Sequence, residues 1–507
     1  MFVRQKKNKS GSVSVQLISK YGGKYKVEKT IGSGRSHEQI SVFLHQARHE
    51  LEKLKQQIGL FVSEQDTSIE GYLQTLENTQ IRTIGPELIF GKIYDAIGFN
   101  AIDEELFRHL VIARLAFPLS KLKTIDYLYR YQGVCIDIDR VYRFLDKLNS
   151  TLKERVEQIA YQHTFKILKG KVSIVFYDMT TLYFEASQED DLRKAGFSKD
   201  GKHHLPQIYI GLLVGLGGYA IGYDIFEGNI YEGDTLIPVI DKLAKKFNLS
   251  KPVVVADAGL LSKENINILA GIGYTYIIGG RPKSEPANIK SKILSAHLQD
   301  GQTMVINKTD GNRLILSFSE KRAAKDEHNR KRGLQRLEKQ VRSGKLTKAS
   351  INNKGYNKYL RMQGQLTIEI DYDKFKEDKQ WDGLKGYITN TTLKPATVLD
   401  QYKNLWHIEK AFRMSKTDLR IRPIYHHLKR RIEAHICLSF TAYAIYKELE
   451  RVLTKEKSDI SLKQAAELTH TMYQLNVVLP ESKRQQTINL KMDELQTQLW
   501  NIILKNY

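Results

Sequence analysis

The spacing of hydrophobic residues divides the chain into a helical first third and a mixed remainder. Residues 11–30 alternate in strand fashion around Gly22 and Gly23, which predicts a β-hairpin. From about Glu38 to Lys169 the apolar positions recur at helical spacing. Residues 120–148 predict two short helices hinged near a glycine, a spacing similar to that of a helix-turn-helix, although any helical bundle also produces such pairs.

From Lys171 the pattern changes to strands. The run "VSIVFYDMTTLYFE" (172–185) predicts a buried strand, and residues 205–229 predict a hairpin that turns at two adjacent glycines. A helix, the strand "PVVVADAGLL" (252–261), a second helix and the strand "YTYIIGG" (274–280) follow. Three antiparallel strands followed by alternating helices and strands predict a mixed α/β sheet.

The alternation of predicted helices and strands stops between Arg281 and about Thr392, which predicts an insertion in the α/β domain. A hairpin that turns at Asp310 and Gly311 precedes a polar, strongly basic helix, and strands return after it. The chain then ends in predicted helices from about Lys394 to Tyr507.

Composition adds a partner class to this picture. The chain has 507 residues and a formal net charge of +22, which favours a polyanionic partner: nucleic acid first, with an anionic membrane surface as the alternative. No window reaches the roughly 18 to 20 apolar residues that cross a bilayer, so we expect a cytosolic protein with no membrane-spanning segment. With nucleic acid preferred, we expect no membrane partner. The two cysteines, Cys135 and Cys437, predict structural thiols and not a disulfide framework or a zinc site.

The basic helix, predicted between Lys321 and Lys345, has two interpretations. A run of charge is usually a solvated helical face, but an excess of Lys and Arg over acids also suits the tracking of phosphates. On the second interpretation, four cations contact DNA: Arg330, Lys331, Arg332 and Arg336.

Two strands carry aspartates that invite a chemical interpretation. Asp178 interrupts an apolar strand, where an unpaired carboxylate is costly; it either binds a metal or caps a turn before Thr180. Asp257 ends another apolar strand, so its side chain should project from the edge where α/β active sites gather. Hard oxygen ligands of this kind suit Mg²⁺ or Mn²⁺.

A third carboxylate comes from a helix predicted over Tyr402 to Lys416. At about 100° per residue, Glu409 shares an apolar stripe with Leu405 and Phe412. Arg413 and Lys416 add positive charge to the same stripe. The arrangement suits a phosphodiester beside a metal, and a structural ion pair is the alternative.

Taken together, these residues resemble the DDE-type bacterial insertion-sequence transposases, in the branch with a Tyr-x2-Arg-x3-Glu-x6-Lys signature. Tyr402, Glu409 and Lys416 match that spacing, while Leu405 stands at the arginine position. The resemblance covers roughly residues 171–434 and includes the segments "FSKDGKHHLPQIYIGLLV", "FEGN", "ADAGLL", "DGLKGYITN" and "RPIYHHLKRRIEAH".

The resemblance implies an RNase H-like catalytic domain with a β-rich insertion. It implies a metal-binding triad of Asp178, Asp257 and Glu409 that holds two Mg²⁺ or Mn²⁺ ions and cleaves and joins DNA. The expected partners are double-stranded DNA, as terminal inverted repeats and target, and a second copy of the chain. Arg413 and Lys416 would hold the element end, and Tyr402 would pack against its sugar or base. The expected location is the bacterial cytoplasm, at the nucleoid.

The domain boundaries follow from the same pattern. We expect a DNA-end-binding region over 1–170, a catalytic domain over 171–281 and 392–450, an insertion over 282–391 and a C-terminal helical region over 451–507.

Two other functions share part of this evidence. A structure-specific nuclease on the same fold would have the three carboxylates but would not join strands. A non-catalytic DNA-binding regulator would keep the basic charge, but the intact set of acids argues against it.

Overall fold

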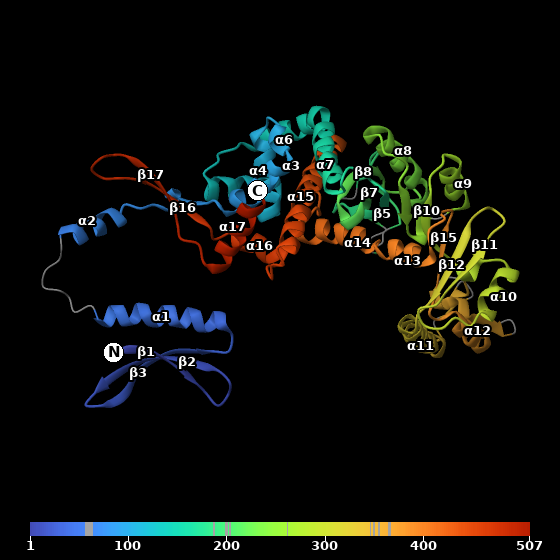
Figure 1. Cartoon of the computed structure of the whole chain (residues 1–507), viewed down its shortest axis with the longest axis horizontal. Coiled ribbons are helices and arrows are strands. Elements are labelled where there is room, and N and C mark those ends of the chain that lie inside the picture. Colours follow the sequence, from blue (N-terminus) through green and yellow to red (C-terminus); the bar gives the residue numbers. More distant parts are fainter. Residues whose placement is uncertain are drawn as a thin grey trace. The chain divides into compact units, whose positions relative to one another are not determined.

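The computed structural model of the chain consists of two compact units (Figure 1). It describes residues 1–55, 64–185, 188–197, 201, 204–260, 262–344, 346–347, 350–352, 355–363 and 367–507. One unit comprises residues 1–78 and 478–484, and the other comprises residues 79–477 and 485–507. In the described part of the chain, we find no helix with the length and apolar character to cross a membrane.

The smaller unit is a three-stranded antiparallel sheet with a helix packed on it. The elements are β1 (Phe2–Lys7), β2 (Val13–Tyr21), β3 (Lys24–Gly34), α1 (His37–Lys55) and α2 (Glu64–Leu73). The predicted hairpin is confirmed, because Tyr21 pairs with Lys24 across the two glycines. Val15, Leu17 and Ala47 form the small core between β2 and α1.

The larger unit begins with helices that pack around one long helix, α15 (Lys429–Lys455). The others are α3 (Lys92–Ile97), α4 (Glu105–Ala116), α5 (Lys121–Tyr127), α6 (Ile138–Lys147), α7 (Lys153–Ile167), α16 (Leu462–Thr469) and α17 (Glu494–Asn506). The predicted hinge between α5 and α6 is confirmed: a π-helical turn (Leu128–Gln132) ends at Gly133, whose φ of 70° favours glycine.

The described residues of this unit also form a nine-stranded sheet (Figure 1). Its strands are β5 (Ile174–Tyr183), β6 (Lys194–Ala195), β7 (Pro206–Val214), β8 (Ala220–Glu227), β9 (Val253–Ala256), β10 (Tyr276–Gly280), β11 (Thr303–Asn307), β12 (Arg313–Phe318) and β15 (Leu384–Thr389). The strands β8, β7 and β5 are antiparallel, and β5, β9 and β10 run parallel. This is the mixed sheet predicted for an RNase H-like domain.

The two faces of the sheet belong to two hydrophobic cores. Val175 and Tyr177 of β5 point to the core beneath α8 (Leu236–Phe247), α9 (Lys263–Gly271) and α10 (Ala287–Ser295). Phe176 and Leu182 point to the core that includes α13 (Pro395–Lys403), α14 (Trp406–Arg413) and α15. Since side chains alternate along a strand, Asp178 lies on the same face as Phe176 and Leu182.

The predicted insertion has two parts. Its first hairpin, β11 and β12, extends the main sheet, because β12 pairs with β15. The remainder, from α11 (Glu320–Arg342) through β13 (Leu360–Gln363), β14 (Thr367–Ile370) and α12 (Tyr372–Glu377), has its own core around Leu337 and Tyr359. α11 is the predicted basic helix; Lys345, where the prediction ended it, lies outside the described residues.

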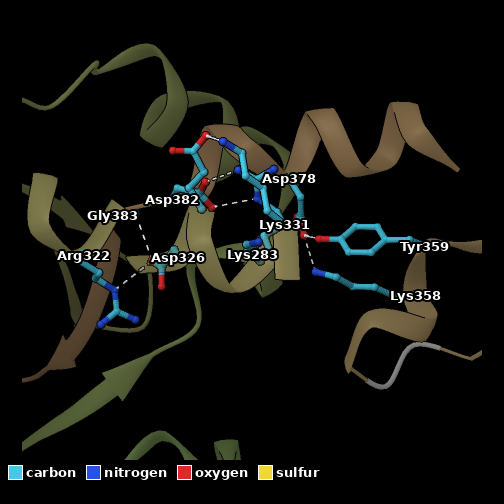
Figure 2. Close-up of polar contacts among 11 residues, drawn as sticks. Lys283, Arg322, Asp326, Lys331, Lys358, Tyr359, Asp378, Asp382 and Gly383 are labelled. Carbon is cyan, nitrogen blue, oxygen red and sulfur yellow. Dashed lines mark hydrogen bonds and ion pairs between the residues drawn. The ribbon is translucent and has the colours of Figure 1, made fainter. Parts of the chain in front are cut away.

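A partly buried polar network ties this subdomain together (Figure 2). Asp378 accepts hydrogen bonds from Lys283 Nζ at 2.8 Å, from the Tyr359 hydroxyl at 2.6 Å and from Lys358. Burial alone would raise the pKa of Asp378, but these three donors hold it below its ordinary value. The carboxylate therefore stays charged and links the segment after β10 to β13 and α12.

Two predicted helical stretches are wrong. The C-terminal region contains a hairpin of β16 (Tyr473–Val478) and β17 (Gln485–Asn489), and β16 pairs with β4 (Ile81–Thr83). The helix predicted over Tyr402–Lys416 is also interrupted. α13 ends at Lys403, α14 begins at Trp406, and a π-helical turn (Met414–Asp418) follows Arg413.

Candidate active site

The sheet register places the two aspartates side by side. Tyr177 of β5 pairs with Ala256 of β9, so the next residues, Asp178 and Asp257, occupy equivalent positions on neighbouring parallel strands. Such strands lie about 4.8 Å apart. Asp257 is exposed at the carboxyl end of β9, while Asp178 is partly buried and accepts a hydrogen bond from the backbone N–H of Met179 at 2.8 Å.

Glu409 joins the aspartates from α14. This helix buries Ile408 and Ala411 against the sheet, which leaves the intervening Glu409 exposed. The three carboxylates line one cleft of about 350 Å³, with Lys385, Tyr402 and Trp406 also in its wall. The structure therefore brings together all three acids that the sequence proposed as a site.

Tyr402 orients Asp257. Its hydroxyl donates a hydrogen bond to Asp257 Oδ1 at 2.8 Å, and its ring is buried against Tyr387. Burial and the nearby Asp257 carboxylate raise the pKa of Tyr402, so the hydroxyl keeps its proton and remains a donor. Gly279 makes room for it, because a Cβ there would lie 2.5 Å from the hydroxyl oxygen.

Lys385 is a member of the cleft that sequence reasoning missed. Its Nζ lies 4.4 Å from the centre of the Tyr402 ring. Burial and the charge of Arg322 lower its pKa, and Asp257 and Glu409 act in the opposite direction. Alternation along β15 was the available signal, since Lys385 lies two residues before Tyr387, which packs in the core on this face.

Three carboxylates line the cleft, and carboxylate oxygens are the type of ligand that a hard divalent cation prefers. In the described part of the chain, no three His, Cys, Asp or Glu side chains are gathered closely enough to hold a metal ion. The cleft thus offers suitable oxygen ligands that share one wall but do not form a closely gathered cluster.

The two cations predicted beside Glu409 lie outside the cleft, whereas Leu405, at the arginine position of the signature, lines it. Arg413 is exposed at the end of α14, and Lys416 lines a separate, largely apolar cavity with Phe412 and Tyr443. Neither is among the described residues that line the carboxylate cleft. Because α14 gives way to a π-helical turn after Arg413, the stripe calculated for one continuous helix does not hold at Lys416.

The basic helix α11 divides its cations between two roles. The DNA-contact prediction is wrong for Arg330: its side chain is buried, and its guanidinium pairs with Asp382. Lys331 is exposed and pairs with Glu327 at 2.8 Å. Arg332 and Arg336 are exposed, whereas Arg330, Gly333 and Leu337 are the buried residues of the helix.

One exposed face of α11 carries a continuous stripe of cations. At about 100° per residue, its members lie within about 40° of Arg332. They are the exposed cations Lys321, Lys325, Arg332, Arg336 and Lys339. The acids of α11, namely Glu320, Asp326, Glu327 and Glu338, lie outside this stripe.

Comparison with known proteins identifies one sequence family. The family described as transposase DDE domain matches residues 169–445, more than half of the chain. A search of curated proteins finds no match. Similar solved structures include a piggyBac transposase synaptic complex with hairpin DNA, at 9% identity and a TM-score of 0.39 over 76% of each chain. Another is a Mos1 transposase paired-end complex with the left transposon end, at 9% identity and a TM-score of 0.16 over 46% of this chain and 71% of that one.

Proposed function

Because the chain belongs to the family of transposase DDE domains, we propose that the carboxylate cleft is where it cuts and joins DNA. The observation that carries the proposal is the convergence of Asp178, Asp257 and Glu409 on one cleft from two strands and a helix distant in sequence. The chain is thus a DNA transposase, and these three residues are its proposed catalytic acids.

Each side chain has a separate part in this scheme. Asp178, Asp257 and Glu409 would hold Mg²⁺ or Mn²⁺, two ions per site, which would activate the attacking oxygen and stabilise the leaving one. Tyr402 keeps Asp257 oriented by its hydrogen bond. Lys385, beside the acids, would attract and position the scissile phosphate.

DNA would be held over a wider surface than the cleft. The cationic stripe of α11 suits a phosphate backbone because acids are absent from it. Arg413 and Lys416 stay proposed contacts to the element end, and Tyr402, which is buried, would touch it only from inside the cleft. Terminal inverted repeats and target DNA are the proposed substrates, and a homodimer would join two ends together.

The domain assignments are part of the same proposal. Residues 171–281 and 392–450 would form the catalytic domain, with β15 adding a strand from within the proposed insertion, 282–391. The proposed end-binding region, 1–170, is divided between the two compact units. The region 451–507 would support α15 from the C-terminal side.

The test is cleavage and joining of the DNA that flanks the coding sequence, which should contain inverted repeats. The full-length protein is incubated with labelled flanking fragments and a target plasmid in Mg²⁺, in Mn²⁺ or in a chelator. We expect nicked and joined products that require the metal and that disappear in Asp178→Asn, Asp257→Asn and Glu409→Gln. Near-normal cleavage by any of these variants would remove that carboxylate from the site.

The same assay distinguishes the two other functions. Cleavage without joining, on branched DNA and without preference for the flanking fragments, would indicate a nuclease. Tight binding to the flanking fragments with no cleavage in either metal would indicate a regulator.

A further inference from the structure

A second cavity, away from the three carboxylates, is lined by cations. It encloses about 510 Å³ between the end of α4, the start of α5, α15 and the loop that follows the π-helical turn after α14. Arg114 and Lys121 project into it although their residues are only 6% and 7% exposed. We call this cavity the basic pocket.

The contacts of these two cations are all with neutral groups. Arg114 Nη1 donates to the carbonyl oxygens of Leu419 at 3.5 Å and Arg420 at 3.2 Å. Lys121 Nζ lies 3.4 Å from Nδ1 of His435. These partners satisfy hydrogen bonds but do not compensate positive charge.

The protonation state of His435 follows from its other nitrogen. Nε2 lies 2.9 Å from the carbonyl oxygen of Ile421, which can only accept, so Nε2 carries the proton. Burial, with Lys121 and Arg114 nearby, holds the pKa of His435 well below its ordinary value. The ring is therefore neutral, and Nδ1 accepts from Lys121.

No acid offsets the two buried charges within the described part of the chain. The pocket wall contains no Asp or Glu, and no described carboxylate forms an ion pair with Arg114 or Lys121. Burial lowers the pKa of Arg114 to about 10 and that of Lys121 well below its ordinary value. Two buried basic side chains with no described acid beside them suit an anion, which would raise the pKa of Lys121 again and hold its proton.

The rest of the wall identifies the kind of anion. Arg420, Arg422 and Lys123 add positive charge around the buried pair. Tyr425, which is 66% exposed, gives the pocket an aromatic wall. The volume is that of a small-molecule site and is larger than a single phosphate ion needs. A phosphate with an attached sugar fits this combination of size, charge and aromatic surface.

We propose that the basic pocket binds a backbone phosphate of DNA at a site separate from the catalytic cleft. The proposal rests on DNA being the substrate. The loop that supplies Arg420 and Arg422 directly follows the segment that carries Glu409, and the Arg422 guanidinium lies 5.2 Å from the centre of the Tyr183 ring on β5, the strand of Asp178. A phosphate held there would fix DNA against the same loop that supports the catalytic helix.

The first experiment uses inorganic phosphate and the thermal unfolding of the full-length protein. Phosphate should raise the Tm of the wild type by several degrees above a chloride control of equal ionic strength, because it binds only the folded state. Lys121→Met should lose this rise and, having lost an uncompensated charge, should unfold no earlier than the wild type without phosphate. Arg420→Gln, at an exposed position, serves as a second variant if Lys121→Met does not fold.

The second experiment measures affinity for duplex flanking DNA across a salt series. Lys121→Met should weaken binding about tenfold and reduce the slope of log K against log salt by about 0.9, the loss of one phosphate contact. Lys166→Met changes an exposed lysine of α7 outside the pocket and should leave both values nearly unchanged.

The outcomes separate this inference from the proposed function. If phosphate does not raise the Tm of the wild type, or raises the Tm of Lys121→Met equally, the basic pocket does not bind phosphate. This conclusion holds even if cleavage is normal. A phosphate response with unchanged DNA affinity and slope in Lys121→Met means that the pocket takes free phosphate, which overturns the DNA assignment. Loss of cleavage in the triad variants is independent of all these results.

Discussion

The acidic cleft and the basic pocket place their charges in opposite ways. In the cleft, Asp257 and Glu409 are exposed, so water can solvate them before any ligand binds. In the basic pocket, Arg114 and Lys121 are buried against carbonyls and a neutral histidine. Water therefore stabilises the charges of the cleft, whereas the two buried basic side chains of the pocket have no acid beside them, among the described residues, to stabilise theirs.

The comparison also separates two tasks. The cleft gathers acids with one tyrosine donor and two lysines, Lys385 and Lys403, an arrangement for chemistry on a phosphodiester. The basic pocket offers donors and positive charge and has no Asp or Glu among the described residues of its wall; burial together with the nearby cations lowers the pKa of His426 to about 3, so its ring is neutral. We infer that the first determines rate and the second determines affinity.

The largest effects come from exchanging one residue in each region. Glu409→Gln should lower the single-turnover cleavage rate at least about 10²-fold and leave DNA affinity unchanged. Lys121→Met should do the reverse: weaker binding, with the rate on pre-bound DNA little changed. Quench-flow cleavage at saturating protein, combined with binding isotherms, measures both. If both variants lost cleavage rate, or both lost DNA affinity, the two regions would not have separate tasks.

Lys385 tests whether the cleft needs its partly buried cation, in addition to the exposed Lys403. Lys385→Met should lower the cleavage rate about tenfold to 10²-fold, because a positive charge beside the developing phosphate charge is lost. Lys394→Met, at the exposed N-cap of α13, is the matched control and should retain the wild-type rate. Partial recovery in Lys385→Arg would support a charge role; equal rates in both methionine variants would make Lys385 a packing residue for Tyr402.

The basic helix α11 allows exposed and buried arginines of the same helix to be compared. Arg332→Ala combined with Arg336→Ala should weaken DNA binding about tenfold and reduce the salt slope by up to about 1.8, without changing stability. Arg330→Met should instead lower the free energy of unfolding by about 2 kcal/mol, because Asp382 loses its buried partner. Salt-series isotherms and urea unfolding distinguish the two, and an unchanged slope in the double variant would make the stripe an ordinary solvated face.

The smallest effect concerns the donor to Asp257. Tyr402→Phe keeps the buried ring and removes only the hydroxyl, so the cleavage rate should fall about threefold to tenfold, more at low metal concentration. Gly279→Ala should imitate it by displacing the hydroxyl. The measurement is the cleavage rate as a function of metal concentration. Identical curves for the wild type and Tyr402→Phe would show that the hydrogen bond from Tyr402 to Asp257 does not contribute to cleavage.

Much of the fold and of the candidate site was available in the pattern of residues. The run of β-branched and aromatic residues around "VFYDMTTLYFE" predicted a buried strand, and the cost of burying a charge marked Asp178 within it. The apolar run before Asp257 placed that residue at a strand end, and the apolar neighbours of Glu409 marked its helix. These features depend on nearest neighbours along the chain, through periods of 2 and 3.6 residues.

Other features depended on which segments meet. The hairpin of β16 and β17 lies in a stretch predicted to be helical, and β16 is fixed as a strand by pairing with β4 at the other end of the unit's sequence. In the sequence, Arg330 cannot be distinguished from the other arginines of α11. In the structure, it is buried by Asp382 and the small core of the insertion. Local pattern does not reveal such partners, because pairing and burial are set by long-range packing.

The sequence by itself determined the strands and helices that carry the three acids, the basic charge of the chain and the family resemblance that joined them. Only the tertiary structure decided that Lys385 joins the acids and that Tyr402 donates to Asp257, because both require the register of β15, β10 and β9. It alone assembled the basic pocket, since Arg114, Lys121, Arg420 and His435 come from three helices and a loop. The physical reason is that a side chain's preference for a strand or helix is local, whereas the burial of its charge depends on everything that packs around it.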